Sequence, residues 1–278
     1  MKYDIRIDDQ DLPLISAVAS EALDMLQDPD ANNHMLEDLI CRDPSLAARV
    51  LRAANSPFYC GRAGVTSIAN AIFRLGMRNL RHVIVIAATG EFFNDSDPTV
   101  QYLWDHSIAT AMASSYLANE LSFSQQNEVF IAGLLHDVGK MIILRQYPGV
   151  YGPMIQQSIA DGTPLHRLEE ENFNFFNHMM VGGLVIRKWK LHDSVAEAAR
   201  FHHDLEEELP PCVNHGQLLC IVTLANHFCR TVAAGARPGD GASLLDRPYV
   251  KELRLSEAKY NAVFHQIRDQ MSQRIGIN

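Results

Sequence analysis

Residues 132–140 read AGLLHDVGK, and this stretch decides how the rest of the chain is interpreted. Its apolar first half has to be buried, so His136 and Asp137 follow directly from a buried helix. Adjacent His and Asp side chains at a helix end can both reach one point, and Gly139 lets the backbone turn there. We therefore expect a buried His-Asp pair at the centre of a functional site.

Helical periodicity extends outward from this stretch in both directions, and signals for strands are scarce. Upstream, Asp43-Pro44 and Thr66-Ser67 are typical helix starts, and Gly76 is a typical helix end. The expected helices cover residues 12–26, 34–41, 44–55, 68–76, 79–93, 101–121, 127–136, 140–147, 150–161, 165–172, 178–189, 194–202, 216–234 and 256–275. The sequence therefore predicts an all-α helical bundle with an N-terminal helical lobe.

Composition restricts the class of protein. Apolar residues make up 47% of the 278 residues, which is enough for a sizeable core. No apolar run approaches the roughly 18 residues that a membrane span needs. The acidic start lacks the order of a signal peptide, so we expect a cytoplasmic protein without a membrane segment. Five cysteines without a CxxC pair indicate buried free thiols rather than disulfides or a cysteine-based zinc site.

Charge is distributed unevenly along the chain. Residues 1–43 hold eleven acidic and three basic side chains, whereas residues 44–90 hold no acidic side chain and six arginines. The polar, Pro-containing stretch NDSDPT at residues 94–99 is the expected hinge between two halves. We therefore predict an N-terminal lobe over residues 1–95 and a second lobe over residues 96–278. A net charge of −9 disfavours nucleic acid as a partner.

The histidines of the second half are placed on inward helix faces by the 3.6-residue period. His106 lies on an apolar stripe with Leu103 and Ala113, and His178 shares a face with Val181 and Val185. A third helix ends on the pair His202-His203, and a fourth carries Asn226 beside its apolar stripe.

Two interpretations of this histidine set remain open. Imidazole nitrogens and a carboxylate are good ligands for Fe, Mn or Zn, and burying them without a metal or many hydrogen bonds is unfavourable. Alternatively, each histidine is a core residue whose hydrogen bonds are satisfied locally. The number of inward-facing histidines beside His136 and Asp137 favours a divalent transition-metal site.

At this point the chain resembles a known family. LLHDVGK is similar to the signature of the HD superfamily of metal-dependent phosphohydrolases. The whole pattern resembles the HDOD domain, a signalling relative of the HD-GYP cyclic-dinucleotide phosphodiesterases. The similar segments occur in the family's order: DPSLAARVLRAANSPFY, SIANAIFRLGMRNLR, WDHSIATA, FIAGLLHDVGKMI, FNHMMVGGLVIRKW and AARFHH. The resemblance covers roughly residues 12–230 and implies an HD-like helical fold.

The resemblance also implies residue roles. The positions that match metal ligands of HD enzymes are His106, His136 and Asp137. The positions that match the second metal site of HD-GYP enzymes are His178, His202 and His203. Lys140 matches a lysine that contacts phosphate, so Asp137 and Lys140 are the candidate catalytic residues.

The sequence departs from the HD pattern at two places. HD enzymes close the site with an aspartate on a late helix, whereas the matching segment IVTLANHF offers Asn226. An amide is a neutral and poorer ligand, so the hydrolytic centre is weakened. The segment FHHDLEEELPP also lacks the Gly-Tyr-Pro that follows the histidine pair in the HD-GYP enzymes.

The arginines of the first lobe form a second candidate site. Five of them are spaced for helix faces or their edges: Arg49, Arg52, Arg74, Arg78 and Arg81. They can bind a phosphate, a nucleotide or an acidic partner. The alternative is a solvated face, or pairing with the acidic first helix.

Three function classes follow from these observations. The first is a regulatory module in signal transduction that binds a metal, a partner signalling protein or a small phosphorylated ligand such as a nucleotide. The second is an active metal-dependent phosphohydrolase or phosphodiesterase. The third, a nucleic-acid binder that uses the arginines, is disfavoured by the overall acidity. Asn226 favours the first class, while the intact histidine set keeps the second open.

Overall fold

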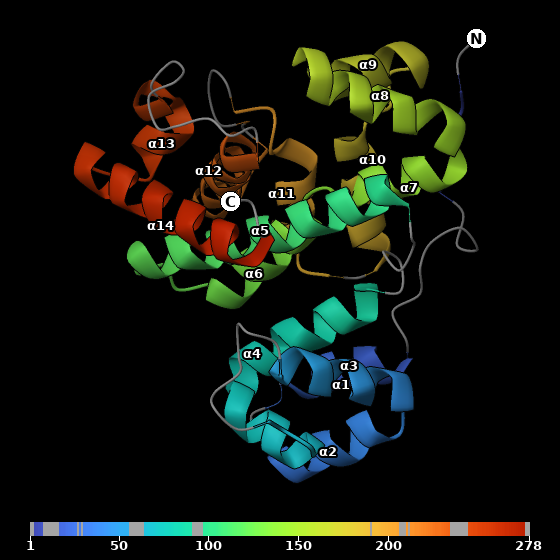
Figure 1. Ribbon diagram of the computed structural model, residues 1–278, viewed down its shortest axis with the longest axis vertical. Helices are drawn as coiled ribbons and strands as arrows, with labels where there is room; N and C mark the ends of the chain where they lie inside the picture. Colours follow the sequence, from blue (N-terminus) through green and yellow to red (C-terminus); the bar gives the residue numbers. More distant parts are fainter. Residues whose placement is uncertain are drawn as a thin grey trace. The chain divides into compact units, whose positions relative to one another are not determined.

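The computed structural model describes residues 3–7, 17–26, 28, 30–55, 64–90, 97–189, 191–205, 210, 212–233 and 244–275 (Figure 1). Every regular element in these ranges is a helix, and they contain no strand. The prediction of an all-α fold is therefore confirmed. Within the same ranges, no helix combines the length and the apolar character that crossing a bilayer would require.

The chain divides into two compact units. The smaller is Pro13–Asp95, and the larger combines Met1–Leu12 with Ser96–Asn278. This division differs from the expected lobe over residues 1–95, because the first residues belong to the larger unit. Tyr3 N donates to Asn172 O at 2.9 Å, and Tyr147 Oη donates to Asp4 O at 2.7 Å. Of the expected hinge at residues 94–99, residues 94–96 lie outside the described residues, and residues 97–99 form the start of α5 (Pro98–Glu120) with its N-cap.

The smaller unit consists of four helices: α1 (Ala17–Met25), α2 (Asn33–Cys41), α3 (Pro44–Ala54) and α4 (Ile68–Gly90). The Asp43 carboxylate caps α3 as predicted, accepting hydrogen bonds from the backbone of Ser45 and Leu46. α4 is kinked at Gly76, where φ is 66°. A residue with a positive φ interrupts an α-helix. The two helices expected on either side of Gly76 are therefore both present, as the two segments of α4.

In the larger unit, the long apolar helix α12 packs against five of the other helices. The elements of this unit are α5 (Pro98–Glu120), α6 (Gln126–Leu135), α7 (Val138–Gln146), α8 (Pro148–Asp161), α9 (Leu165–Asn172), α10 (His178–Lys188), α11 (Asp193–Phe201), α12 (Gly216–Ala233), η1 (Leu244–Asp246), α13 (Pro248–Glu252) and α14 (Glu257–Ile275). α12 contacts α5, α6, α11, α13 and α14, and residues 218–226 of its length are buried. The long, apolar α12 is thus the central helix of this unit.

Several local expectations are corrected by the structure. The short elements η1 and α13 were not expected from the sequence, and α13 contributes the buried Tyr249 and Val250. The expectation of buried thiols holds for Cys220 and Cys229. It is wrong for Cys41 and Cys212, which are exposed. The Gly-rich stretch AAGARPGDGAS at residues 233–243 is typical of a surface loop, and all of it except residue 233 lies outside the described residues.

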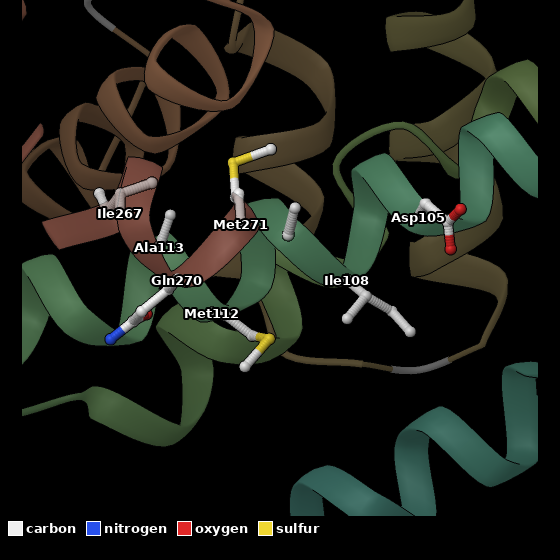
Figure 2. Close-up of a pocket in the computed structure, with 8 residues that line it drawn as sticks. Asp105, Ile108, Met112, Ala113, Ile267, Gln270 and Met271 are labelled. Carbon is white, nitrogen blue, oxygen red and sulfur yellow. The ribbon is translucent and has the colours of Figure 1, made fainter. Parts of the chain in front are cut away.

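One pocket of about 360 Å³ lies between α5 and α14 (Figure 2). Its wall is mostly apolar, with one carboxylate on α5. Its lining residues are Asp105, Ile108, Ala109, Met112, Ala113, Ile267, Gln270 and Met271. None of them belongs to the histidine-rich set, so this pocket is separate from the predicted metal site.

Candidate metal centre

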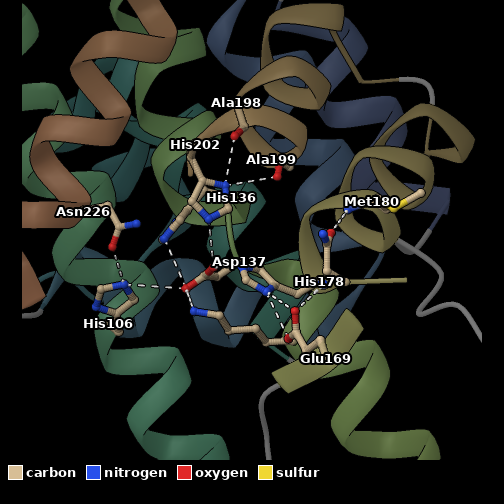
Figure 3. A network of polar contacts seen from close by, with 12 residues as sticks. His106, His136, Asp137, Glu169, His178, Met180, Ala198, Ala199, His202 and Asn226 are labelled. Carbon is tan, nitrogen blue, oxygen red and sulfur yellow. Dashed lines mark hydrogen bonds and ion pairs between the residues drawn. The ribbon is translucent and has the colours of Figure 1, made fainter. Parts of the chain in front are cut away.

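The His-Asp pair occupies the two-residue connection between α6 and α7, and both side chains are buried. Each oxygen of the Asp137 carboxylate faces two imidazoles (Figure 3). Oδ1 lies 3.5 Å from His178 Nε2 and 3.4 Å from His202 Nε2. Oδ2 lies 3.2 Å from His136 Nε2 and 3.6 Å from His106 Nε2. Helices α5, α10 and α11 therefore bring their histidines to one carboxylate.

The Asp137 carboxylate is held in its ionised form. Burial works to raise its pKa, but the charge of the neighbouring Lys140 ammonium helps to hold the pKa well below its usual value. Lys140 Nζ donates to Oδ2 at 2.6 Å. In contrast, Oδ1 is buried and accepts no hydrogen bond. The centre thus contains a carboxylate with one paired and one unpaired oxygen.

Backbone carbonyls fix the orientation of two of the imidazoles. His136 Nδ1 lies 2.8 Å from Gly133 O, and His202 Nδ1 lies 3.1 Å from both Ala198 O and Ala199 O. A carbonyl only accepts, so each Nδ1 carries the hydrogen. Burial lowers the pKa of His202 to about 3, so its ring is neutral. Its Nε2 therefore presents a lone pair toward the carboxylate.

A buried glutamate orients the third imidazole. Glu169, on α9, accepts from His178 Nδ1 at 2.7 Å and from His178 N at 2.9 Å. Tyr151 Oη also donates to this carboxylate. Burial works to raise the pKa of Glu169, but the hydrogen bonds from His178 and Tyr151 lower it below its usual value. An ionised Glu169 thus holds the His178 hydrogen on Nδ1 and leaves Nε2 as an acceptor.

The arrangement fits a cation. The Nε2 atoms of His136, His178 and His202 are buried and have no hydrogen-bond partner, as is true of Asp137 Oδ1. Acceptors that face one another without a hydrogen between them are unfavourable unless a positive charge lies among them. Two groups of donor atoms lie close enough together to share an ion. One is Asp137, His178, His202 and His203, and the other is His106, His136 and Asp137.

His106 and Asn226 bond to each other. His106 Nε2 lies 3.0 Å from Asn226 Oδ1, so the imidazole donates and the amide oxygen accepts. Burial lowers the pKa of His106 to about 3, so the ring is neutral and its single hydrogen is on Nε2. In this state His106 has no Nε2 lone pair to give to a metal ion.

His203 lies at the half-exposed edge of the centre. Its ring centroid is 4.2 Å from that of His202 and 5.4 Å from that of His178. Burial and the neighbouring His202 lower the pKa of His203 well below its usual value. The ring centroid of His166 lies 5.4 Å from that of His203, so a histidine that was not among the predicted site residues borders the centre.

Close helix packing places α7 against α10. A Cβ built on Gly139 would lie 2.0 Å from the carbonyl oxygen of His178. Gly139 lies within α7 and does not have a positive φ, so the expectation that it supplies a turn is wrong. Its missing side chain instead lets the helix that follows Asp137 approach the start of α10, where His178 lies.

Sequence reasoning missed Glu169 and His166. They are three residues apart on α9, so they share one helix face directed at the centre. Glu169 begins a run of three glutamates, which is the usual pattern of a solvated surface. The spacing His166-x-x-Glu169 was the available signal, but nothing in it distinguishes a buried face from an exposed one.

The candidate arginines all belong to the smaller unit. Arg49 donates to a serine hydroxyl one turn earlier in α3 at 2.7 Å, and Arg52 is exposed. Arg74 and Arg81 are half-buried on α4, each with one buried nitrogen that has no hydrogen-bond partner. The side chain of Arg78 lies outside the described residues. Anion binding by these arginines stays a prediction.

Comparisons with known proteins agree with the family resemblance. A family model described as the HDOD domain matches residues 12–205. An uncharacterised protein of Treponema pallidum (strain Nichols) is 25% identical over 217 residues, which cover 75% of this chain and 41% of that protein. The chain thus spans less than half the length of this relative.

Solved structures share the fold. An HDOD domain protein of unknown function from Geobacter sulfurreducens superimposes with a TM-score of 0.75 at 24% identity, covering 97% of this chain and 94% of that one. A candidate signal transduction protein from Marinobacter aquaeolei VT8 superimposes with a TM-score of 0.77 at 22% identity. The match covers 98% of this chain and 62% of that one. A candidate phosphohydrolase from Shewanella amazonensis SB2B superimposes with a TM-score of 0.70 at 22% identity. The match covers 96% of this chain and 92% of that one.

Proposed function

Because the chain belongs to the HDOD family, we propose that it is a regulatory module of signal transduction that uses a degenerate HD phosphohydrolase site for binding rather than turnover. Its partner is a signalling protein or a small phosphorylated ligand such as a nucleotide. The names of two structural neighbours, one for signal transduction and one for phosphohydrolysis, agree with a fold that serves both roles.

The hydrogen bond between His106 and Asn226 carries this proposal. Both residues match metal-ligand positions of HD enzymes, yet at 3.0 Å they satisfy each other. An amide in place of a carboxylate also removes one negative charge that would help to hold a metal ion. The half of the centre that matches the HD hydrolytic site is therefore short of ligands.

The alternative is an active metal-dependent phosphohydrolase. It is favoured by the unpaired Nε2 atoms around Asp137, which fit a metal ion. When bound, such an ion supplies Lewis acidity toward a phosphate ester. Lys140, half-buried beside the carboxylate, can contact a phosphate oxygen of a ligand in either case.

A turnover assay separates the two functions. The purified chain is loaded with Mn²⁺ or Fe²⁺ and supplied with cyclic dinucleotides, nucleoside phosphates and a generic phosphodiester. We expect calorimetric binding of a phosphorylated ligand without release of product. Turnover that disappears in both His136→Ala and Asp137→Ala would overturn the regulatory proposal.

The role of residue 226 has its own test. We expect Asn226→Asp to create or raise hydrolysis, because a carboxylate restores the charge and the ligand atoms that the amide lacks. Asn119→Asp, at an exposed position of α5, adds the same charge away from the centre and serves as the matched control. Equal activity in the two variants would show that residue 226 is not the missing part.

A further inference from the structure

The two oxygens of the Asp137 carboxylate have different surroundings. Oδ2 accepts a short hydrogen bond from the Lys140 ammonium at 2.6 Å, and Oδ1 accepts none. The carboxylate therefore already has a cation on one side, supplied by the chain itself. On the other side its charge faces only imidazoles.

The Oδ2 side offers few free ligand atoms. His106 Nε2 donates its hydrogen to the Asn226 amide oxygen and cannot bind a metal ion. Of the two histidines that face Oδ2, only His136 therefore offers a ring nitrogen with a free lone pair as a metal ligand. A metal ion placed here would also meet the Lys140 ammonium, and two positive charges within a few ångströms repel strongly in a buried site. This side is therefore unfavourable for an ion.

The Oδ1 side offers a complete set of ligands. His178 Nε2 and His202 Nε2 both face Oδ1 without a hydrogen-bond partner. Their Nδ1 hydrogens are committed to Glu169 and to backbone carbonyls, so neither ring needs to turn before it binds. His203 supplies a fourth donor atom within 4.8 Å of the other three.

We propose that the centre holds a single transition-metal ion, bound by Asp137, His178, His202 and His203, while Lys140 and the His106–Asn226 bond take the place of a second ion. Three imidazoles and one carboxylate suit Zn²⁺, Fe²⁺ or Mn²⁺. The inference rests on the proposed function, because it says which half of a degenerate HD site stays able to bind metal.

Metal stoichiometry tests this assignment without reference to activity. The full chain is stripped with a chelator, loaded with Co²⁺, desalted and analysed for metal content and for the visible absorption of bound cobalt. We expect one ion per chain. His203→Ala is the preferred variant on the Oδ1 side because this residue is half-exposed, and we expect it to weaken binding at least about 10-fold and to change the spectrum.

Variants on the Oδ2 side have the opposite expectation. His106→Ala keeps one ion with the same spectrum, because this residue does not hold it. Lys140→Met combined with Asn226→Asp removes the ammonium and restores a carboxylate, so that double variant takes up two ions per chain. His265→Ala, exposed on α14, is the control, and far-ultraviolet circular dichroism verifies that each variant is folded.

Three results would overturn the inference: no bound ion, two ions in the unaltered chain, or loss of the ion in His106→Ala with retention in His203→Ala. Its failure can be distinguished from that of the proposed function. Two ions without phosphodiester turnover would contradict the single-ion site alone. One ion with robust turnover would contradict the regulatory proposal and leave the single-ion site intact.

Discussion

The closest helix approach in the centre leads to a sharp prediction. Replacing Gly139 by alanine puts a methyl group 2.0 Å from the backbone carbonyl oxygen of His178, about 1 Å closer than real Cβ atoms come to any neighbour. The obstacle is backbone, so no side chain can rotate away. Either α7 or the start of α10 has to move.

The size of the effect follows from this geometry. Overpacking a close contact costs about 1–3 kcal/mol, and a clash with backbone belongs at the upper end. A loss of about 3 kcal/mol lowers the midpoint of thermal unfolding by roughly 6–12 °C in a domain of this size. Because His178 begins α10, we also expect weaker metal binding in the Gly139→Ala variant.

Differential scanning calorimetry of the metal-free protein measures the shift. Gly149→Ala is the matched control, since a Cβ at Gly149, also in a helix, meets nothing within 4 Å. That control should unfold at the original temperature or slightly higher, because alanine is the better helix former. If both variants unfold at the same temperature, the close approach of α7 and α10 is not as described.

Two further predictions concern the buried charges. Glu169→Gln should lower the free energy of unfolding by about 1–3 kcal/mol and weaken metal binding about 10- to 100-fold, whereas Glu171→Gln, which is exposed, should change neither. The second concerns His106 and His202, whose pKa values fall from 6.5 to about 3 on burial. The unfolded chain then binds more protons below pH 6.5, so stability is complete above that pH and declines as the pH falls toward 3. At pH 5 each histidine should remove about 2 kcal/mol, and identical urea midpoints at pH 7.5 and pH 5 in chelator would contradict this.

The sequence predicted most of the helices because their boundaries depend on local signals. Asp43-Pro44 caps α3 through bonds that span only two and three residues, and α9 begins and ends where its periodicity does. The short α13 could not be found in this way. Five residues are too few for a periodic pattern, and its stability comes from packing against α12.

The site was predictable to the extent that its residues lie on apolar helix faces. His106, His178 and the 202–203 pair follow from periodicity, and the structure brings them to one carboxylate. The partners that orient them could not be predicted in the same way. Glu169 contacts His178 across nine residues and two helices, a separation that helical periodicity does not predict.

Residues 3–7 have a consequence for how the protein is made. They leave the ribosome before their partners, because Arg6 N bonds to Gln146 Oε1 and Ile7 O accepts from Lys188 Nζ, which are 140 and 181 residues further along. At about 5–20 residues per second, these partners emerge roughly 7 to 36 s later. The smaller unit, which lies between, can fold during that interval from local contacts. The N-terminal segment therefore joins the larger unit only after α7 and α10, which carry these partners, have been made.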